Sequence, residues 1–191
     1  MQSLNMFSWW TFTDIFEEGG LRAEPFSNAF GLQNIYGIAK PVFRAFEMLH
    51  AAGDAIIIAN ISAPSSAISA FATVLSSSAQ EVLRGGQLFI TNFRRFDLPI
   101  QNDTAVVYVN HGSLPAPSVA YVSIIDSMHA NPRGLWESWG SPMYPTSAQL
   151  AQLDAASQLV GEAVPLVSVS PSVISFTIHL EPYACAFVHF Y

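Results

Sequence analysis

The stretch Thr104–Asp126, TAVVYVNHGSLPAPSVAYVSIID, decides the fold class. Both of its halves are rich in β-branched and aromatic residues, as strands are, and Pro115-Ala116-Pro117 separates them as a turn. Similar runs recur along the chain: DAIIIANI (54–61), AISAFATVL (67–75), GQLFITNF (86–93), AVPLVSVS (163–170), SVISFTIHL (172–180) and YACAFVHFY (183–191). Many short strands at this spacing predict a mainly β fold, an antiparallel β-sandwich.

Two segments depart from this pattern and predict helices. The run KPVFRAFEMLHAAG (40–53) has Pro41 at a first helical position and Gly53 at its end. Its expected apolar stripe is Val42, Ala45, Phe46 and Leu49. Near the end of the chain, Thr146-Ser147-Ala148-Gln149 has the pattern of a capping box and predicts a helix near 146–159.

The N-terminal part of the chain predicts one α/β unit. Residues 4–13 alternate and contain many aromatics, which is typical of a strand, and residues 14–39 indicate a long ordered loop before the helix at 40–53. We therefore expect a strand–loop–helix unit over 1–53 and a sandwich over 54–191. A single parallel strand needs neighbours on both sides. The unit either packs on the sandwich, pairs with another chain, or belongs to a barrel whose other strands lie elsewhere.

Composition excludes several classes of partner. Seven basic residues stand against fourteen acidic ones, and Lys40 is the only lysine, so we expect no nucleic acid and no anionic membrane as partner. The longest apolar run is far shorter than a spanning helix. Charged residues make up only 11% of the chain, which predicts a weakly charged surface that another chain or domain partly covers.

Cysteine content and sequons address redox state and compartment. Cys185 is the only cysteine, which excludes an internal disulfide, and its apolar surroundings predict a buried, inert thiol. No signal peptide is visible at the N-terminus, whereas Asn60-Ile61-Ser62 and Asn102-Asp103-Thr104 are acceptor sequons that favour a secreted parent protein. The compartment stays open.

Three stretches of the chain resemble a known family. SWWTFTDIFEEGG (8–20) and FSNAFGLQNIYGIAKPVFRAFEMLHAAGD (26–54) are similar to the last strand and last helix of the (β/α)₈ barrel of family 39 glycoside hydrolases, which include β-xylosidases and α-L-iduronidases. DSMHANPRGLWESWGSPMYPTSAQLAQLDAAS (126–157) resembles the part of their C-terminal β-sandwich where an aromatic hairpin leads into a helix. The resemblance implies a truncated barrel unit over 1–53, followed by the sandwich.

The resemblance also implies a retaining glycosidase without its bond-breaking residues. Such enzymes need two carboxylates about 5 Å apart, one as acid/base and one as nucleophile. In the family, the acid/base follows an asparagine on the fourth barrel strand and the nucleophile ends the seventh. Neither has a counterpart here, and the chain contains no Asn-Glu dipeptide. We therefore expect no catalytic residue, no cofactor and no hydrolysis by this chain alone.

The residues that the resemblance carries over are substrate contacts. Trp10 matches a tryptophan that stacks on the sugar ring, and Glu17 and Glu18 match a pair that reaches sugar hydroxyls. Phe12 and Asp14 match supporting positions.

Other interpretations of these residues stay open. Trp9 and Trp10 point to opposite faces of a strand, so one of them can be core. Glu17 and Glu18 can be a solvated loop pair. A further interpretation makes Asp14 and one of the two glutamates an improvised acid–nucleophile pair. The sequence shows no feature that would raise the pKa of one carboxyl group and hold that of the other down.

The remaining polar and aromatic residues offer weaker sites. His50, His111, His129, His179 and His189 form no paired-ligand spacing, so we expect no metal site. Trp136, Trp139 and Tyr144 indicate an aromatic cluster in a loop or hairpin. Packing is the favoured role for this cluster, and sugar binding is the alternative.

Three functional hypotheses remain. The first is the C-terminal part of a retaining glycosidase that acts on terminal bonds of a xylose- or uronic-acid-type glycoside. The second is a lectin-like carbohydrate-binding module or a self-associating accessory chain. The third is a shortened gene model without a separate role. The expected partners are carbohydrate and either a second copy or a catalytic chain.

Overall fold

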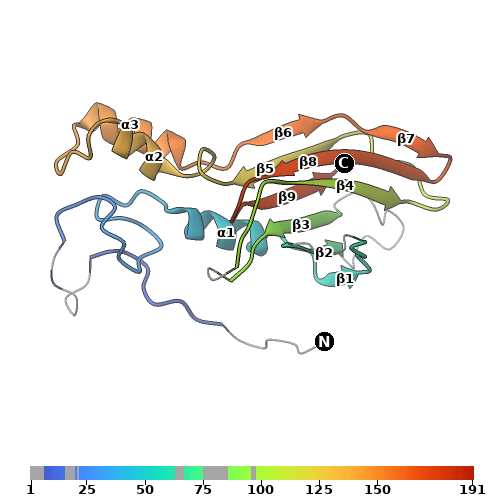
Figure 1. Cartoon of the computed structure of the whole chain (residues 1–191), viewed down its shortest axis with the longest axis horizontal. Helices are drawn as coiled ribbons and strands as arrows, with labels where there is room; N and C mark the ends of the chain where they lie inside the picture. Colours follow the sequence, from blue (N-terminus) through green and yellow to red (C-terminus); the bar gives the residue numbers. More distant parts are fainter. Residues whose placement is uncertain (1–6, 16–19, 21, 63–66, 75–85, 96–97) are drawn as a thin grey trace. The chain divides into compact units, whose positions relative to one another are not determined.

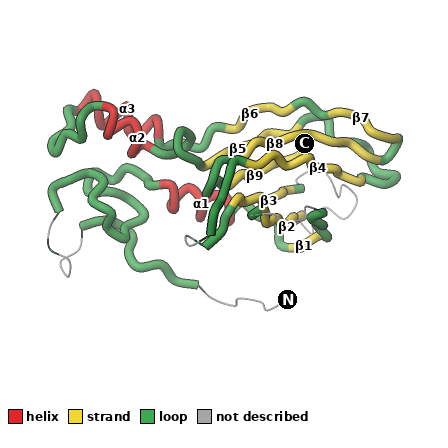
Figure 2. Tube along the Cα trace, in the orientation of Figure 1, coloured by secondary structure: helices red, strands yellow, loops and turns green. Residues whose placement is uncertain are grey.

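The computed structural model describes residues 7–15, 20, 22–62, 67–74, 86–95 and 98–191 (Figures 1 and 2). The chain forms two compact units. The first joins residues 1–44 to residues 130–158, and the second joins residues 45–129 to residues 159–191. Within the described residues, nine strands and three helices make a mainly β fold in which every strand pairing is antiparallel, as the sequence predicts.

Two antiparallel sheets build the second unit. The larger has the order β1-β2-β3-β9-β5-β6 and the smaller the order β4-β8-β7 (Figure 1). The larger sheet contains β1 (Ala55–Ile57), β2 (Ile68–Val74), β3 (Gln87–Asn92), β9 (Cys185–Phe190), β5 (Ala120–Ile125) and β6 (Gly161–Val164). The smaller sheet contains β4 (Asp103–Asn110), β8 (Val173–Leu180) and β7 (Val167–Ser170).

The two sheets share one apolar core. Leu88, Ile90 and Val188 of the larger sheet are buried in the same cluster as Phe176 and Ile178 of the smaller sheet. Strand β8 alternates in burial and places every second side chain in this core, whereas β3 and β9, in the middle of the larger sheet, are buried at almost every position. The predicted antiparallel sandwich is therefore confirmed for this unit.

One predicted strand, residues 163–170, is divided into two strands in the structure, and Pro165 explains the division. The run 163–170 becomes β6, which pairs with β5 in the larger sheet, and β7, which pairs with β8 in the smaller sheet. Proline has no amide hydrogen to donate to a ladder. The chain therefore passes from one sheet to the other at this position.

Helices and loops build the first unit. Helix α2 (Pro132–Ser138) and helix α3 (Ser147–Ala156) contribute Trp136 and Leu153 to a core that also contains Phe26 and Ile38. The rings of Phe26 and Trp136 lie 5.5 Å apart between centroids. Helix α3 begins at the predicted capping box, whereas the predicted aromatic hairpin is wrong. Helix α2 stands there instead, with Pro132 in its first turn.

The predicted strand over 4–13 is not formed in its described part. Residues 1–6 lie outside the described residues, and the rest of the segment contains only an isolated parallel bridge between Thr13 and Gln33. Alternation and aromatic content predict a strand, but a strand needs long partners on the hydrogen-bonding edges. Within the described residues of this unit, only a few backbone hydrogen bonds join the segment to residues 32 and 33.

Helix α1 (Pro41–His50) begins at Pro41 as predicted, but its apolar stripe is wrong at one position. Leu49 is 48% exposed, and the buried residues of the helix are Arg44 and Met48, one turn apart. The Arg44 side chain donates from Nε to the carbonyl of Ser157 at 2.6 Å. A buried arginine with such a partner takes a position that an apolar pattern does not reveal.

Candidate functional site

The predicted sugar site lies in the segment from Trp9 to Asp14 of the first unit. Trp10 is 67% exposed, and Trp9 and Phe12 are also exposed, so neither tryptophan is a core residue. The indole Nε1 of Trp9 donates to the carbonyl of Phe30 at 2.8 Å. The peptide bond between Trp10 and Thr11 is cis.

Backbone hydrogen bonds hold this segment against residues 31–33. The amide of Leu32 donates to the carbonyl of Thr11 at 3.0 Å, and that of Gln33 donates to the carbonyl of Phe12 at 3.0 Å. The Asp14 amide in turn donates to the carbonyl of Gln33 at 2.9 Å. These hydrogen bonds therefore fix the backbone from Thr11 to Asp14, directly after Trp10.

Asp14 is the buried anchor of this arrangement. Its carboxylate accepts hydrogen bonds from the Lys40 ammonium, at 2.8 and 3.0 Å, and from the amide of Gly31 at 2.7 Å. Lys40 also donates to the carbonyl of Ala29 at 2.8 Å. An added Cβ at Gly31 would collide with the backbone of Thr13 and Asp14, so the two segments approach closely only because this residue is glycine.

The improvised acid–nucleophile pair receives no geometric support. Asp14 is 2% exposed, and protein donors occupy both of its oxygens. Glu17 and Glu18 lie outside the described residues. Asp14 is the carboxylate that the structure describes in this segment. It lies buried in an ion pair and not at a surface that a substrate reaches.

The second aromatic group separates into a buried and an exposed part. Trp136 is buried in the core of the first unit, and its Nε1 donates to the carbonyl of Pro142 at 2.9 Å. Trp139 is half-buried against the same core, whereas Tyr144 is 76% exposed. Packing is therefore the role of Trp136, and the three rings do not form one exposed platform.

The titratable side chains that the structure describes in the second unit offer no metal site. Among the described residues, no three His, Cys, Asp or Glu side chains gather closely enough to hold a metal ion. Burial raises the pKa of the Cys185 thiol, which suits an inert thiol, and burial lowers the pKa of His189. No helix in the described part of the chain has the length and apolar character needed to cross a bilayer.

Lys40 is the site residue that sequence reasoning missed. It lies 26 residues from Asp14, and only the fold brings the two together. The available signal was compositional: the single lysine of the chain stands directly before the first residue of a helix.

Comparison with known proteins places the chain in a class of carbohydrate-active enzymes. A family model described as "Glycosyl hydrolases family 39" matches residues 1–170. A β-xylosidase of Caldicellulosiruptor saccharolyticus is 34% identical over 181 residues, which cover 95% of this chain and 35% of that protein. A β-xylosidase of Geobacillus stearothermophilus is 41% identical over 54 residues, or 28% of this chain and 11% of that protein. The chain therefore belongs to glycosyl hydrolase family 39.

Solved structures agree on the fold. The GH39 enzyme from Xanthomonas axonopodis pv. citri superposes with a TM-score of 0.75 at 22% identity, covering 96% of this chain and 36% of that one. A monomeric β-xylosidase from Caulobacter crescentus CB15 gives 0.68 at 20% identity and covers 96% and 37%. This chain thus spans about a third of the length of these relatives.

Proposed function

We propose that this chain forms one wall of the sugar-binding site of a family 39 glycosidase. The observation that carries the proposal is the exposed Trp10 ring at the start of a backbone that Asp14 and Lys40 hold in place. Aromatic faces with a few placed polar groups are typical of sites for small molecules. Trp10 stacks on the sugar ring, and Glu17 and Glu18 accept hydrogen bonds from its hydroxyls.

Phe12 and Asp14 support that wall. Phe12 is exposed like Trp10, two positions before it in the chain, and Asp14 fixes the loop through Gly31 and Lys40. Asp14 is in this proposal a positioning residue that does not touch the sugar.

The reaction of the whole glycosidase is retaining hydrolysis of a terminal glycosidic bond. A xylose-type glycoside is favoured over a uronic-acid type because the relatives from Caldicellulosiruptor saccharolyticus and Geobacillus stearothermophilus are each named β-xylosidase. We propose that residues 1–53 are the last unit of a (β/α)₈ barrel and that residues 54–191 are the sandwich domain, from which residues 130–158 depart to pack with the N-terminal segment. The acid/base and nucleophile have no counterpart in this sequence, so the chain binds sugar and does not cut it. Sugar binding without hydrolysis is also what a lectin-like carbohydrate-binding module would show.

Calorimetry tests the proposal. We expect saturable binding of xylobiose, weaker binding of a uronic-acid disaccharide, and loss of the binding in Trp10→Ala. Tyr144→Ala removes another exposed aromatic ring of the same unit and should leave binding unchanged. Absence of binding, or equal binding by Trp10→Ala, would contradict a sugar wall at Trp10.

The exposed apolar residues of the N-terminal segment imply a partner surface. Besides the proposed sugar wall, Phe7, Ile15 and Phe30 are each more than half exposed. We propose that a second copy or a catalytic polypeptide covers them. Light scattering after size-exclusion chromatography should show masses above the 20.8 kDa of the chain, whereas a monomer at high concentration would argue against a second copy.

A further inference from the structure

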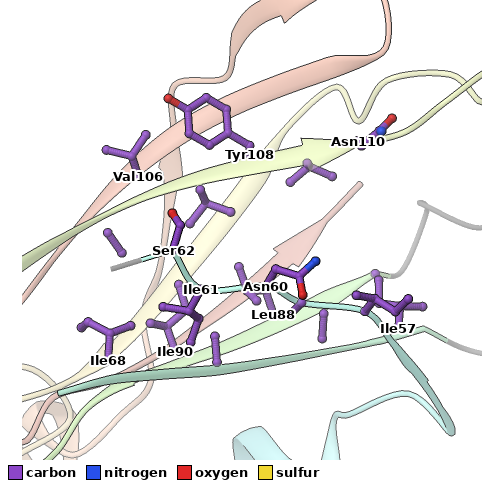
Figure 3. Close-up of a pocket in the computed structure, with 18 of the residues that line it drawn as sticks. Ile57, Asn60, Ile61, Ser62, Ile68, Leu88, Ile90, Val106, Tyr108 and Asn110 are labelled. Atoms are coloured by element: carbon purple, nitrogen blue, oxygen red, sulfur yellow. The ribbon is translucent and has the colours of Figure 1, made fainter. Parts of the chain in front are cut away.

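A cavity of the second unit lies between β4 and the larger sheet (Figure 3). The chain's own residues 57–62 line it together with β2, β3 and β4. A segment of the sandwich therefore already occupies part of this space. The exposed rings and fixed polar groups that a sugar needs lie in the first unit instead.

In the first unit, the loop over residues 26–31 carries the hydrogen-bond partner of Trp9. The carbonyl of Phe30 accepts from the Trp9 indole Nε1 at 2.8 Å, and Trp10 is the next residue of the chain. Both chain neighbours of Phe30 are hydrogen-bonded to the buried ion pair of the site. The loop therefore sets the position of the Trp9 indole directly before Trp10.

Helix α2 holds the other end of this loop. Arg133 donates from Nη1 to the Oδ1 of Asn28 at 2.5 Å and from Nε to the Oε1 of Glu137 at 2.7 Å. Because Glu137 lies one turn further along the same helix, it orients the guanidinium group toward Asn28. The rings of Phe26 and Trp136 pack against each other between the same loop and the same helix. All of these residues belong to the first compact unit.

The backbone of Asn28 makes this contact specific. Its φ is +58°, in the left-handed region that few residues other than glycine adopt readily. Glycine would suit this backbone but has no side-chain oxygen to accept from Arg133. Asparagine combines the left-handed conformation with an acceptor.

We propose that Asn28 and Arg133 are positioning residues for sugar binding, an inference that rests on the sugar wall proposed above. Their hydrogen bond fixes the loop, so that the carbonyl of Phe30 holds Trp9 and the backbone enters Trp10 in one orientation. Neither residue touches the sugar. A ring held in place before binding loses less entropy on binding, so the loss of this hydrogen bond weakens the affinity without removing a sugar contact. Arg133, 105 positions after Asn28, thus makes helix α2 a part of the sugar wall.

Two substitutions at one position test this role. Asn28→Gly removes the acceptor and keeps the left-handed backbone free of strain, whereas Asn28→Asp keeps an acceptor opposite Arg133. We expect Asn28→Gly to weaken the affinity for xylobiose in calorimetry by at least about threefold, and Asn28→Asp to bind as wild type does. Arg133→Met should match Asn28→Gly. The double variant should bind no more weakly than either single variant, because both changes remove the same hydrogen bond.

A second measurement follows Trp9 in the absence of sugar. In proton–nitrogen NMR spectra, the indole Nε1 hydrogen of Trp9 should exchange with water at least about threefold faster in Asn28→Gly than in wild type. The Trp136 indole, which donates to the carbonyl of Pro142, should exchange as in wild type. A general loss of stability would instead accelerate both exchange rates. Trp9→Phe identifies the Trp9 signal by removing it.

The outcomes separate this role from the sugar wall itself. If wild type binds xylobiose, an unchanged affinity or an unchanged Trp9 exchange rate in Asn28→Gly would overturn the positioning role and leave the sugar wall standing. Equal acceleration of both indoles, or binding by Asn28→Asp as weak as that by Asn28→Gly, would also overturn it. No binding by wild type would contradict the sugar wall and, with it, any role of Asn28 in sugar binding.

Discussion

At the scale of single residues, the buried ion pair between Asp14 and Lys40 carries the geometry of the candidate site. We predict that Lys40→Met destabilises the protein by about 3–5 kcal/mol, because the Asp14 carboxylate is left buried without its charge partner. Urea unfolding followed by tryptophan fluorescence measures this loss.

The matched control for this pair is the double variant Lys40→Met with Asp14→Asn. The neutral amide no longer needs a cation, and its oxygen still accepts from the amide of Gly31, so the double variant should be more stable than Lys40→Met alone. A Lys40→Met protein within about 0.5 kcal/mol of wild type would show that the pair is not a buried anchor.

The residues of the site differ in how well they could be predicted from the sequence. Trp10 stands in a recognisable motif, and its ring is exposed as a sugar platform requires. Lys40 was missed because its partner is distant in sequence, and Trp136 was ambiguous because aromatic composition alone does not separate a core ring from a surface ring.

At the scale of elements, strands of the sandwich were predictable because their β-branched content and alternation arise from the two-sheet core itself. Two strand predictions were wrong in extent. DAIIIANI forms a strand only over Ala55–Ile57, and residues 7–13 form a single bridge. Helix α2 was missed because it spans only seven residues, too few for a periodic apolar pattern to stand out.

Helix α3 offers an element-scale prediction. The Thr146 side chain accepts from the amide of Gln149 at 3.3 Å, and the Gln149 side chain accepts from the amide of Thr146 at 2.9 Å. Thr146→Ala removes one half of this capping box and should lower the free energy of unfolding by about 1 kcal/mol. Chemical denaturation monitored by circular dichroism checks it.

Thr146→Ser is the control for the cap, since serine keeps the hydroxyl. It should be within a few tenths of a kcal/mol of wild type, roughly the spread among good N-cap residues. Equal stability of Thr146→Ala and Thr146→Ser would mean that packing of Leu153 alone holds the helix.

At the scale of the whole molecule, each compact unit is built from two separated segments of the chain. Local sequence patterns predict a strand–loop–helix segment and a sandwich, but they do not reveal that residues 130–158 pack with the N-terminal segment. That association depends on contacts such as the one between Phe26 and Trp136, which are 110 positions apart. Local pattern carries no signal for such contacts.

The central claim is that this family 39 chain binds sugar through Trp10 without cutting it. Proton NMR of xylobiose mixed with the chain tests binding and hydrolysis in one sample. We predict saturation transfer from protein to sugar that is lost in Trp10→Ala, with no new anomeric signals of xylose during incubation. Absence of transfer to wild type, or xylose signals that grow with time and in proportion to the chain, would contradict it.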